Sequence, residues 1–390
     1  MSPIYFDAAA SRKPLEAVLK RFNDVSVEYY ANPSALHIAG ARAEGVLRSS
    51  SVTISRYLRV DPGEIYFTSG GTESNNLALF GMAKLRPRTH RHIVTLLSEH
   101  PSVTEVLKKL ETEGFEVTWL RGIPSVNEIL GALRPDTALV CVAHVNNETG
   151  NIYDIDSIGK EIKARSEACF YSDGVQGFGK IPLSLKYVDG YSFSGHKIGC
   201  VKGIGGLYLS RTRPIAPQIL GGAQQNNIRS GTENTASAAA LALACETAFD
   251  CMEENYRIVT AVRDELLNIT GLIKDVHING ICTGVSQDMT VIIPDSASPY
   301  ILNMSFLGVR SEVLLHSLAE AGLLASAGSA CSAGKKGAKK NALTAMGYDK
   351  AVYESALRFS FSPENTVDEA KRALSLICEK VSFLRKYMRQ

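Results

Sequence analysis

Short apolar runs alternate with amphipathic stretches between about residue 60 and residue 210 of the chain. A short apolar run bounded by turn residues is typical of a buried strand, whereas apolar residues that recur every three or four positions are typical of a helix. Strands that alternate with helices form a largely parallel sheet with helices on both faces. This region is therefore predicted to be an α/β domain. Its predicted strands are Ile65–Thr68, His92–Leu97, Phe115–Leu120, Ala138–Val142, Ala168–Tyr171, Gly190–Phe193 and Gly206–Leu209.

Amphipathic stretches between these runs are predicted to be helices. Apolar residues recur with the helical period in Pro101–Glu113, and Asp156–Ser166 is a second helix candidate. Farther along, residues 234–268 are rich in Ala, Leu and Glu, so we expect one long helix that leads out of this domain.

The remainder of the chain is more mixed, and we interpret it as a second, smaller α+β domain that the N-terminal residues join. Residues 15–255 are assigned to the large domain, and residues 1–14 with residues 256–390 to the small one. In the small domain the pattern predicts strands at Ser305–Val309 and Ala356–Phe361, helices at Glu312–Ala321 and Val367–Tyr387, and a Gly/Ala/Ser/Lys loop at residues 326–340.

Composition narrows the class of protein. The 390 residues are 45% hydrophobic and 21% charged, with 32 Gly and 14 Pro, which excludes disordered and collagen-like chains. Lys and Arg number 42 against 40 Asp and Glu, so the net charge of +2 gives no reason to expect nucleic acid or an anionic membrane as a partner. The start of the sequence lacks the pattern of a secretory signal, and no apolar stretch approaches the roughly 20 residues of a membrane span. We expect a soluble, cytoplasmic protein.

Eight cysteines are scattered along the chain and none forms a CxxC pair, so the sequence contains neither a zinc ribbon nor a thioredoxin motif and predicts no metal site. Most of them are expected to be small buried apolar residues. Cys331 differs, because it lies in the Gly/Ala/Ser loop, where a structural cysteine would have little core to fill. Lys335, Lys336, Lys339 and Lys340 follow it, and their positive charge favours a reactive thiolate.

A glycine-rich segment, Ser69–Asn75, follows the first predicted strand and begins a predicted helix. Its glycines permit a tight turn, and free N–H groups at the helix start can hold a phosphate together with the Thr72 hydroxyl. The segment matches neither the P-loop nor the dinucleotide-binding pattern. Taken alone, it is explained equally well as a glycine turn with a threonine cap.

A single lysine stands at a second candidate site. Lys197 lies between the end of the strand Gly190–Phe193 and the glycine-rich run Gly199–Gly206. Ligands of parallel sheets bind at this edge, and a lysine that is desolvated there can lose its proton and form a Schiff base. Asp173 ends an earlier strand, from which a carboxylate can hold a pyridine nitrogen protonated. A lysine, an acidic partner and a phosphate-binding turn are together what pyridoxal phosphate requires.

Matches to one protein family run along nearly the whole chain. In chain order they are Tyr5-Phe6-Asp7-Ala8-Ala9-Ala10, Asn32-Pro33-Ser34 with His37, Thr68-Ser69-Gly70-Gly71-Thr72-Glu73-Ser74-Asn75-Asn76, Glu99-His100, Val145-Asn146-Asn147-Glu148-Thr149-Gly150, Asp173 with Gln176, Ser194-Gly195-His196-Lys197, Arg229-Ser230-Gly231-Thr232, Gly328-Ser329-Ala330-Cys331 and Leu357-Arg358-Phe359-Ser360. With these residues the chain resembles the cysteine desulfurases of the nitrogen-fixation and housekeeping iron–sulfur group, within the fold type I enzymes that use pyridoxal 5'-phosphate. The resemblance implies a homodimer whose large domain has a mostly parallel seven-stranded sheet flanked by helices and whose smaller domain is α+β.

The resemblance also implies roles around the cofactor. Lys197 would form the Schiff base with pyridoxal phosphate and later move the substrate proton, and Asp173 would pair with the pyridine nitrogen. Gln176 and Asn147 would lie near the phenolic oxygen, while His100 would stack on the ring and act as an acid or base. Without the resemblance, a lone loop histidine is better explained as one whose ring is satisfied by the backbone.

The resemblance implies further how substrate and phosphate are held. Arg358 would bind the substrate carboxylate beside Asn147, a task that suits a planar bidentate donor, although taken alone it is also explained by an ion pair. Cys331 would be the nucleophile. The cofactor phosphate would be bound by Gly71, Thr72, Ser194, His196 and, across a homodimer, Thr232 of the partner subunit.

The expected function is that of a cysteine desulfurase that depends on pyridoxal phosphate. Sulfur would leave L-cysteine as a persulfide on Cys331, the remainder would become L-alanine, and an iron–sulfur scaffold or a thiolation carrier would accept the sulfur. Alternatives on the same scaffold are a selenocysteine lyase, a cysteine sulfinate desulfinase, a small aminotransferase and a catalytically idle protein that only binds partners. Dependence on Cys331 separates the enzymes, since cleavage of selenocysteine or a sulfinate needs this thiol little or not at all.

Three segments depart from the family pattern. Ile198-Gly199-Cys200-Val201 stands where family members usually have Tyr-Gly-Pro, and we interpret Cys200 as a packing residue. The paired threonines that usually follow the N-terminal alanines are missing from the sequence. The lysines after Cys331 make that loop unusually basic, and we hypothesise that they attract an acidic sulfur acceptor.

Overall fold

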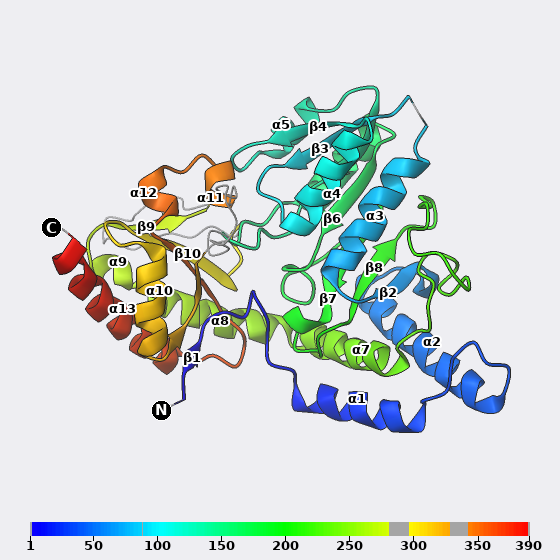
Figure 1. Cartoon of the computed structure of the whole chain (residues 1–390), viewed down its shortest axis with the longest axis horizontal. Helices are drawn as coiled ribbons and strands as arrows, with labels where there is room; N and C mark the ends of the chain where they lie inside the picture. Colours follow the sequence, from blue (N-terminus) through cyan, green and yellow to red (C-terminus); the bar gives the residue numbers. More distant parts are fainter. Residues whose placement is uncertain (1, 88, 281–295, 328–341, 389–390) are drawn as a thin grey trace.

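The computed structural model describes residues 2–87, 89–280, 296–327 and 342–388, and Figure 1 shows two parts that lie side by side. The larger part is built on a seven-stranded sheet and the smaller part on a four-stranded sheet. Helix α8 (Met252–Leu267) runs between the two parts.

The seven strands of the large sheet follow the order β2-β8-β7-β6-β5-β3-β4. Strand β8 is antiparallel to both of its neighbours, and all other neighbouring pairs are parallel. The predicted strands are all present with small shifts at their ends, so the prediction of a mostly parallel α/β sheet is confirmed. The strands are β2 (Ile65–Thr68), β3 (His92–Leu96), β4 (Glu116–Leu120), β5 (Thr137–Cys141), β6 (Cys169–Asp173), β7 (Gly190–Ser194) and β8 (Gly205–Leu209).

Helices cover both faces of this sheet, as successive residues of β3 illustrate. Ile93 belongs to the apolar cluster beneath α3 and α4, whereas Val94 belongs to the cluster on the opposite face, with α5, α6 and α7. Successive side chains of a strand point to opposite faces, so burial on both sides explains the nearly continuous apolar runs in the sequence. None of the helices among the described residues is long and apolar enough to cross a membrane. The helices are α1 (Glu16–Glu28), α2 (Ile38–Leu58), α3 (Gly71–Leu85), α4 (Pro101–Thr112), α5 (Val126–Gly131), α6 (Ile155–Arg165) and α7 (Thr235–Asp250).

The small part has its own apolar core around an antiparallel sheet in the order β12-β13-β10-β9. The N-terminal residues contribute to this core, since Ile4 and Phe6 are buried in it and β1 (Ile4–Tyr5) pairs in parallel with β11 (Leu323–Leu324). The exact domain boundaries stay a prediction. The other elements are β9 (Val276–Asn279), β10 (Ile301–Phe306), β12 (Ser326–Ala327), β13 (Ala356–Ser360), α9 (Ile269–Leu272), α10 (Ser311–Glu320), α11 (Ala342–Ala345), α12 (Lys350–Tyr353) and α13 (Val367–Met388).

Two elements differ from the sequence prediction. The single helix expected over residues 234–268 is two helices, α7 and α8, which meet at Cys251. The helix is interrupted there, and α7 packs in the core of the large part whereas α8 packs in the core of the small part. The strand expected at Ser305–Val309 is the end of β10, which stops at Phe306, and Gly308 turns the chain with φ of 83°.

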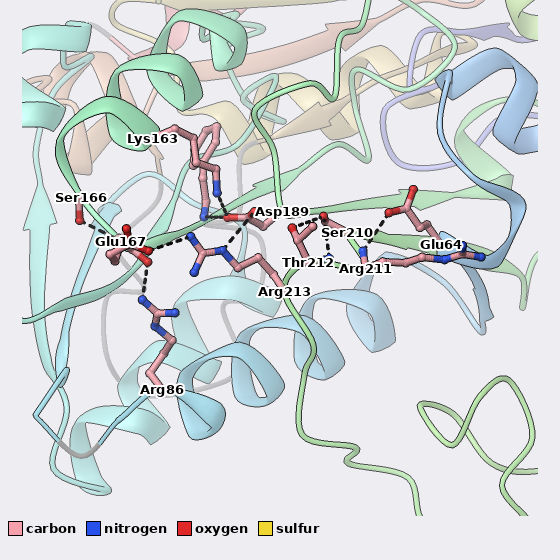
Figure 2. Close-up of polar contacts among 12 residues, drawn as sticks. Glu64, Arg86, Lys163, Ser166, Glu167, Asp189, Ser210, Arg211, Thr212 and Arg213 are labelled. Carbon is pink, nitrogen blue, oxygen red and sulfur yellow. Dashed lines mark hydrogen bonds and ion pairs between the residues drawn. The ribbon is translucent and has the colours of Figure 1, made fainter.

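A polar network ties the sheet to α6 at the amino ends of the strands (Figure 2). Asp189 directly precedes β7, is buried, and accepts hydrogen bonds from Nζ of Lys163 at 2.5 Å and from the N–H of Phe170 at 2.8 Å. Nε of Arg213 lies 3.8 Å from its other carboxylate oxygen. Two cations therefore balance the charge of this carboxylate.

Candidate active site

The carboxyl ends of the parallel strands border a cavity of about 390 Å³, a size typical of small-molecule sites. Segments that are far apart in the sequence bring ten of the twelve predicted site residues to this one cavity. Thr232 does not line it, and Cys331 lies outside the described residues. The ten residues are Gly71, Thr72, His100, Asn147, Asp173, Gln176, Ser194, His196, Lys197 and Arg358.

Lys197 is positioned by the turn that follows β7. Gly195–Lys197 form a short 3-10 turn, η2, whose start is fixed by a hydrogen bond from the N–H of Gly195 to the carbonyl of Ile204 at 3.0 Å. The Lys197 Nζ donates to the carbonyls of Ala9 at 2.5 Å and Ala10 at 2.8 Å. Burial, followed by the nearby guanidinium of β13, lowers the pKa of Lys197 to about 8. The amine therefore has a neutral fraction at neutral pH, as a nucleophile toward an aldehyde requires.

Asp173 ends β6 and is buried at the wall of the cavity. It accepts hydrogen bonds from Nδ2 of Asn75 at 2.8 Å, from the N–H of Val175 at 3.0 Å and from the hydroxyl of Ser192 at 3.4 Å. Among the described residues, no cation forms an ion pair with it. A buried carboxylate is stabilised by a cation or by several hydrogen bonds. This position therefore suits a ligand that carries a protonated nitrogen.

His100 begins α4 as its N-cap residue. Its Nδ1 accepts a hydrogen bond from the N–H of Ser102 at 3.1 Å and lies 2.8 Å from Oγ of Ser102. Burial lowers the pKa of His100, and the nearby charge of Asp173 opposes this effect. The positive charges of Lys197 and Arg358 add to the lowering. The ring is therefore neutral at neutral pH.

The start of α3 presents free backbone N–H groups beside the cavity. Gly70 turns into the helix with φ of 149°, and a Cβ on Gly71 would overlap Cγ2 of Val175, so only glycine leaves room there. The acid in the first turn, Glu73, is paired with Nε of Arg229 at 2.8 Å, which leaves the helix start suited to an external anion. Helix N-termini bind phosphate through such N–H groups and the helix dipole.

Ser194 lies beside this helix start, and His196 directly precedes the reactive lysine. Oγ of Ser194 would be 3.6 Å from a Cβ on Gly70, which places it beside the turn. Nδ1 of His196 lies 3.3 Å from Oγ of Ser11. Burial, and then the positive charge of Lys197, lowers the pKa of His196 to about 4, so its ring is a neutral hydrogen-bonding group.

Arg358 projects from β13 of the small part into the cavity. Its guanidinium donates to the carbonyl of Asn147 at 2.8 Å and to Oδ1 of Asp7 at 3.0 Å. Its Nε is buried and has no hydrogen-bond partner in the described part of the chain. A guanidinium that is held in place and keeps an unused donor suits a carboxylate. Asp7 also accepts a hydrogen bond from the hydroxyl of Ser326 in β12 at 2.8 Å.

Gln176 is held from two sides. Its Nε2 donates to the carbonyl of Ala9 at 3.0 Å, and its Oε1 accepts from Nζ of Lys180 at 3.1 Å. Lys180 is buried, and burial followed by the charge of Lys197 lowers its pKa to about 7. These two contacts fix which end of the Gln176 amide is the donor.

Two predicted residues are not brought to the cavity. Thr232, expected to come from a partner subunit, is exposed and lies outside the cavity of its own chain. Cys331 and the four lysines that follow it lie outside the described residues, so their roles stay predictions. The described chain before them ends with β12, whose Ser326 contacts Asp7.

The cysteines within the described residues are mostly packing residues. Cys200 belongs to the apolar core of the large part, and burial raises its pKa to about 12, which confirms its interpretation. Cys141, Cys169 and Cys245 are buried too, whereas Cys251 is exposed where α7 meets α8. In the described ranges, no group of three His, Cys, Asp or Glu side chains could hold a metal ion.

Sequence reasoning assigned no role to several residues that support the site. Asn75 and Asp7 stand within matched motifs, but their partners come from distant strands. Ser102 carries a signal, because its N–H is the one that an N-cap side chain two residues earlier accepts. Glu99 is buried, and its Oε1 accepts from the N–H of Ala143 at 2.6 Å. Burial, and then the carboxylate at the end of β6, raises the pKa of Glu99 well above its usual range.

Comparisons with known proteins agree with this arrangement. Residues 4–373 match the family model described as aminotransferase class-V. A protein named cysteine desulfurase from Trichormus azollae is 36% identical over 392 residues, which cover 99% of this chain and 94% of that protein. A solved structure described as a NifS-like protein has a TM-score of 0.87 at 31% identity and covers 98% of this chain and 100% of its own. Another, SspA in complex with cysteine, has a TM-score of 0.75 at 30% identity and covers 92% and 99%.

Proposed function

The chain belongs to the aminotransferase class-V family, and on this premise we propose that it is a cysteine desulfurase, which converts L-cysteine into L-alanine and protein-bound sulfur. The observation that carries the proposal is the single cavity in which Lys197, Asp173 and Arg358 meet. An amine nucleophile, a buried carboxylate without a cation and a carboxylate-binding guanidinium are the groups that this reaction needs. The full-length likeness to a protein named cysteine desulfurase supports the same conclusion.

Pyridoxal phosphate is the proposed cofactor, and the residues of the cavity fit it. Class-V aminotransferases generally depend on this cofactor, which supplies an aldehyde and an electron-withdrawing ring that stabilises negative charge on the substrate Cα. Lys197 would hold the aldehyde carbon, and Asp173 would pair with the pyridine nitrogen. The other residues proposed to hold it are Gly71, Thr72, His100, Asn147, Gln176, Ser194 and His196, with Thr232 supplied across a homodimer.

Lys197 is the proposed proton carrier. Its Nζ, with a pKa lowered to about 8, gives up a proton more readily than an ordinary lysine and so serves first as nucleophile and then as base. The proton that it removes is the one on the Cα of L-cysteine. Asp173 supports this step because its carboxylate, fixed by three hydrogen bonds, can balance a positive ring nitrogen.

Arg358 is the proposed binding group for the carboxylate of L-cysteine. The side chain lines the cavity, and each of its two terminal nitrogens keeps a second N–H for the substrate, while Asp7 and the carbonyl of Asn147 hold the plane of the guanidinium. These contacts orient the arginine before substrate arrives, which reduces the entropy lost on binding.

Cys331 is the proposed sulfur acceptor within the protein. Its thiolate would attack the sulfur of L-cysteine, so that an S–S bond forms while the C–S bond breaks and its electron pair stays with carbon. That carbon then takes up a proton and is released as part of L-alanine. The persulfide sulfur would pass to a protein acceptor such as an iron–sulfur scaffold or a thiolation carrier, which the lysines after Cys331 would attract if it is acidic.

The decisive experiment compares wild type with Cys331→Ala, supplied with pyridoxal phosphate, L-cysteine and a thiol reductant. Wild type is expected to release alanine and sulfide in equal amounts, whereas Cys331→Ala should release neither at a comparable rate. Cys251→Ala is the matched control, because that thiol is exposed but does not line the cavity. Undiminished sulfide release by Cys331→Ala would favour a lyase that does not need the thiol.

The cofactor proposal has a separate test in absorbance. A protein that binds pyridoxal phosphate through Lys197 should show a band near ~410–420 nm that borohydride removes. Lys197→Ala should lack this lysine-bound band, and Lys180→Ala, which alters the neighbouring buried lysine, should retain it. If only Lys180→Ala lost the band, the cofactor would be linked to Lys180 and the proposed linkage to Lys197 would be wrong.

A homodimer is proposed as the working assembly. The exposure of Thr232, in a chain whose own cavity it does not reach, supports its donation to a second subunit. Sedimentation at working concentration should give twice the chain mass. A monomer with full activity would contradict this part of the proposal.

A further inference from the structure

A continuous chain of hydrogen bonds joins Asp173 to His100 beside the cavity. Nδ2 of Asn75 donates to Oδ2 of Asp173 at 2.8 Å and to Oγ of Ser102 at 2.7 Å. Oγ of Ser102 lies 2.8 Å from Nδ1 of His100, and Oδ1 of Asn75 accepts from the hydroxyl of Tyr171 at 2.5 Å. Asn75, Ser102, Asp173 and Tyr171 are buried, so water does not compete for these contacts.

The direction of each hydrogen bond follows from the carboxylate at one end. A carboxylate only accepts, so the amide of Asn75 must turn its Nδ2 toward Asp173. The same Nδ2 also meets Oγ of Ser102, which therefore accepts one proton and keeps its own to donate. Because Nδ1 also accepts from the N–H of Ser102, it carries no proton, and Oγ is the donor in its 2.8 Å contact with Nδ1. Nδ1 is consequently an unprotonated acceptor.

The backbone of α4 requires the same state of the ring. His100 is the N-cap residue, and its Nδ1 accepts from the N–H of Ser102 at 3.1 Å. An N-cap side chain satisfies an unpaired N–H of the first turn, so it has to be an acceptor. A positive charge at this end of the helix would also be repelled by the helix dipole. Two donors thus converge on Nδ1, and protonation there would break the contact with the N–H of Ser102 and reverse the contact with its hydroxyl.

We propose that Asp173, Asn75 and Ser102 fix His100 as a neutral imidazole whose only ring proton is on Nε2. Asn75 and Ser102 are positioning residues, because they act on the ring and not on a substrate. The consequence for catalysis rests on the proposed function: His100 presents a hydrogen-bond donor and does not take the substrate proton, which leaves Lys197 as the base.

The charged groups near His100 are consistent with this state. Asp173 favours the protonated ring, whereas Lys197 and Arg358 disfavour it, and burial outweighs each of them. The carboxylate would therefore pull a proton onto a ring that it faced directly. Here Asn75 and Ser102 lie between the carboxylate and the ring. Asn75 donates to Asp173 and to Ser102, and the hydroxyl of Ser102 donates to Nδ1.

His37 is a natural reference within the same chain. It is the N-cap residue of α2, and its Nδ1 accepts from the N–H of Gly40 at 3.2 Å. Within the described residues, no buried amide and hydroxyl pair connects this ring to a carboxylate. The two histidines therefore share the contact with a backbone N–H. Only His100 is also connected through side-chain hydrogen bonds to a carboxylate among the described residues.

The test is the ring tautomer, observed by proton–nitrogen NMR correlation of protein labelled with nitrogen-15 in histidine, with and without pyridoxal phosphate. The signals of His100 are those lost in His100→Gln. At pH 7 we expect one neutral form, with Nδ1 unprotonated and Nε2 protonated. A ring that carries its proton on Nδ1, or on both nitrogens, overturns the proposal.

Variants of Ser102 test whether the chain sets the tautomer. Ser102→Ala removes the hydroxyl contact but keeps the backbone N–H of residue 102, so it should shift the Nδ1 resonance, and Ser102→Thr should restore the wild-type signal. The signals of His37 should be the same in both variants. An unchanged His100 spectrum in Ser102→Ala overturns the role of the chain. If Ser102→Ala does not fold, the wild-type spectrum still decides the tautomer.

Alanine formation tests the consequence for catalysis. His100→Gln keeps an N–H donor but cannot exchange a proton, so we expect a loss in kcat below about tenfold, whereas removal of an acid or base costs about 10²–10⁴-fold. A loss in that larger range overturns the consequence. If wild type forms no alanine, the proposed function fails, and the NMR result on the tautomer stands independently.

Discussion

Two buried aspartates lie at opposite edges of the same sheet and have different electrostatic surroundings. At the amino edge, Asp189 lies within ion-pair distance of Lys163 and Arg213 (Figure 2). At the carboxyl edge, Asp173 accepts hydrogen bonds only from neutral amide and hydroxyl groups of the described residues. The chain therefore completes the charge balance of the first carboxylate and leaves that of the second to a ligand.

A structural carboxylate can therefore be told from a functional one by whether it has a cationic partner, and not by how deeply it is buried. Both side chains are nearly inaccessible, so burial alone gives no distinction. In a parallel sheet, ligands bind at the carboxyl edge, where helix N-termini and loops converge. A carboxylate at that edge without a cation is available to a protonated nitrogen, whereas an ion-paired one at the other edge fastens helix to strand.

The largest expected effect distinguishes the two aspartates by activity. Asp173→Asn should lower kcat for alanine formation by at least about 10²-fold, since an electrostatic partner in the cavity is lost. Asp189→Asn, the matched control, should retain kcat within about tenfold at temperatures where it is folded. Both are measured with saturating pyridoxal phosphate. Equal losses would show that the comparison does not identify the functional carboxylate.

Two arginines, Arg358 at the cavity and Arg213 beside Asp189, are expected to differ in the same way. Arg358→Lys removes the planar donor proposed to bind the substrate carboxylate, so KM for L-cysteine should rise by about 10- to 100-fold, the scale of one charge-assisted hydrogen bond. Arg213→Lys should leave KM unchanged, because Arg213 lies at the opposite edge. Steady-state kinetics measure both. A fall in kcat of Arg358→Lys without a change in KM would remove the binding role.

The two Asp→Asn variants should rank in the opposite order when the free energy of unfolding is measured. Asp189→Asn should lower the free energy of unfolding by about 2 kcal/mol, because it removes a charge that joins α6 to the sheet. Asp173→Asn should cost less in the protein without cofactor, since no cation loses its partner. Urea unfolding at pH 7 gives both values. A larger loss for Asp173→Asn would mean that its neutral contacts are the more important ones.

The strands and the residues that line the cavity were predictable because their signals are local. A buried parallel strand is an apolar run whatever its neighbours are, and the motifs around Gly71, Asp173 and Lys197 each sit where a strand ends. The interruption at Cys251 was not predictable, because α7 and α8 form one helical pattern and separate only to join two cores.

The residues that hold the site residues in place could not be predicted from the sequence for a related reason. Asn75 belongs to a matched motif, yet its contacts reach β6 and the first turn of α4, which only the folded chain brings together. The pairing of Asp7 with Arg358 joins residues from opposite ends of the sequence. Hydrogen-bond direction depends on such tertiary contacts, so spacing along the chain cannot give it. Cys331 stays a prediction from sequence.

The smallest expected effect is a difference in pH dependence between two lysines, Lys163 and Lys197. Nζ of Lys163 is bonded to the carboxylate of Asp189, whereas Nζ of Lys197 is bonded to two carbonyls and has a pKa lowered to about 8 by burial. Only the neutral amine reacts with an aldehyde, so the rate of cofactor attachment should rise with pH through about 8 and then level. Between pH 7 and pH 9 the neutral fraction rises roughly tenfold.

The same shift fixes the sign of the stability change with pH. The folded pKa of Lys197 lies below its ordinary value of 10.5, so between about 8 and 10.5 the unfolded chain binds more protons than the folded one. The cofactor-free protein should therefore gain stability from Lys197 as pH rises through this window. Lys197→Met should lose this gain, whereas Lys163→Met should retain both the gain and the pH profile of attachment. An attachment rate that falls as pH rises, or a midpoint near the ordinary lysine value, would mean that the cavity does not desolvate the Lys197 amine.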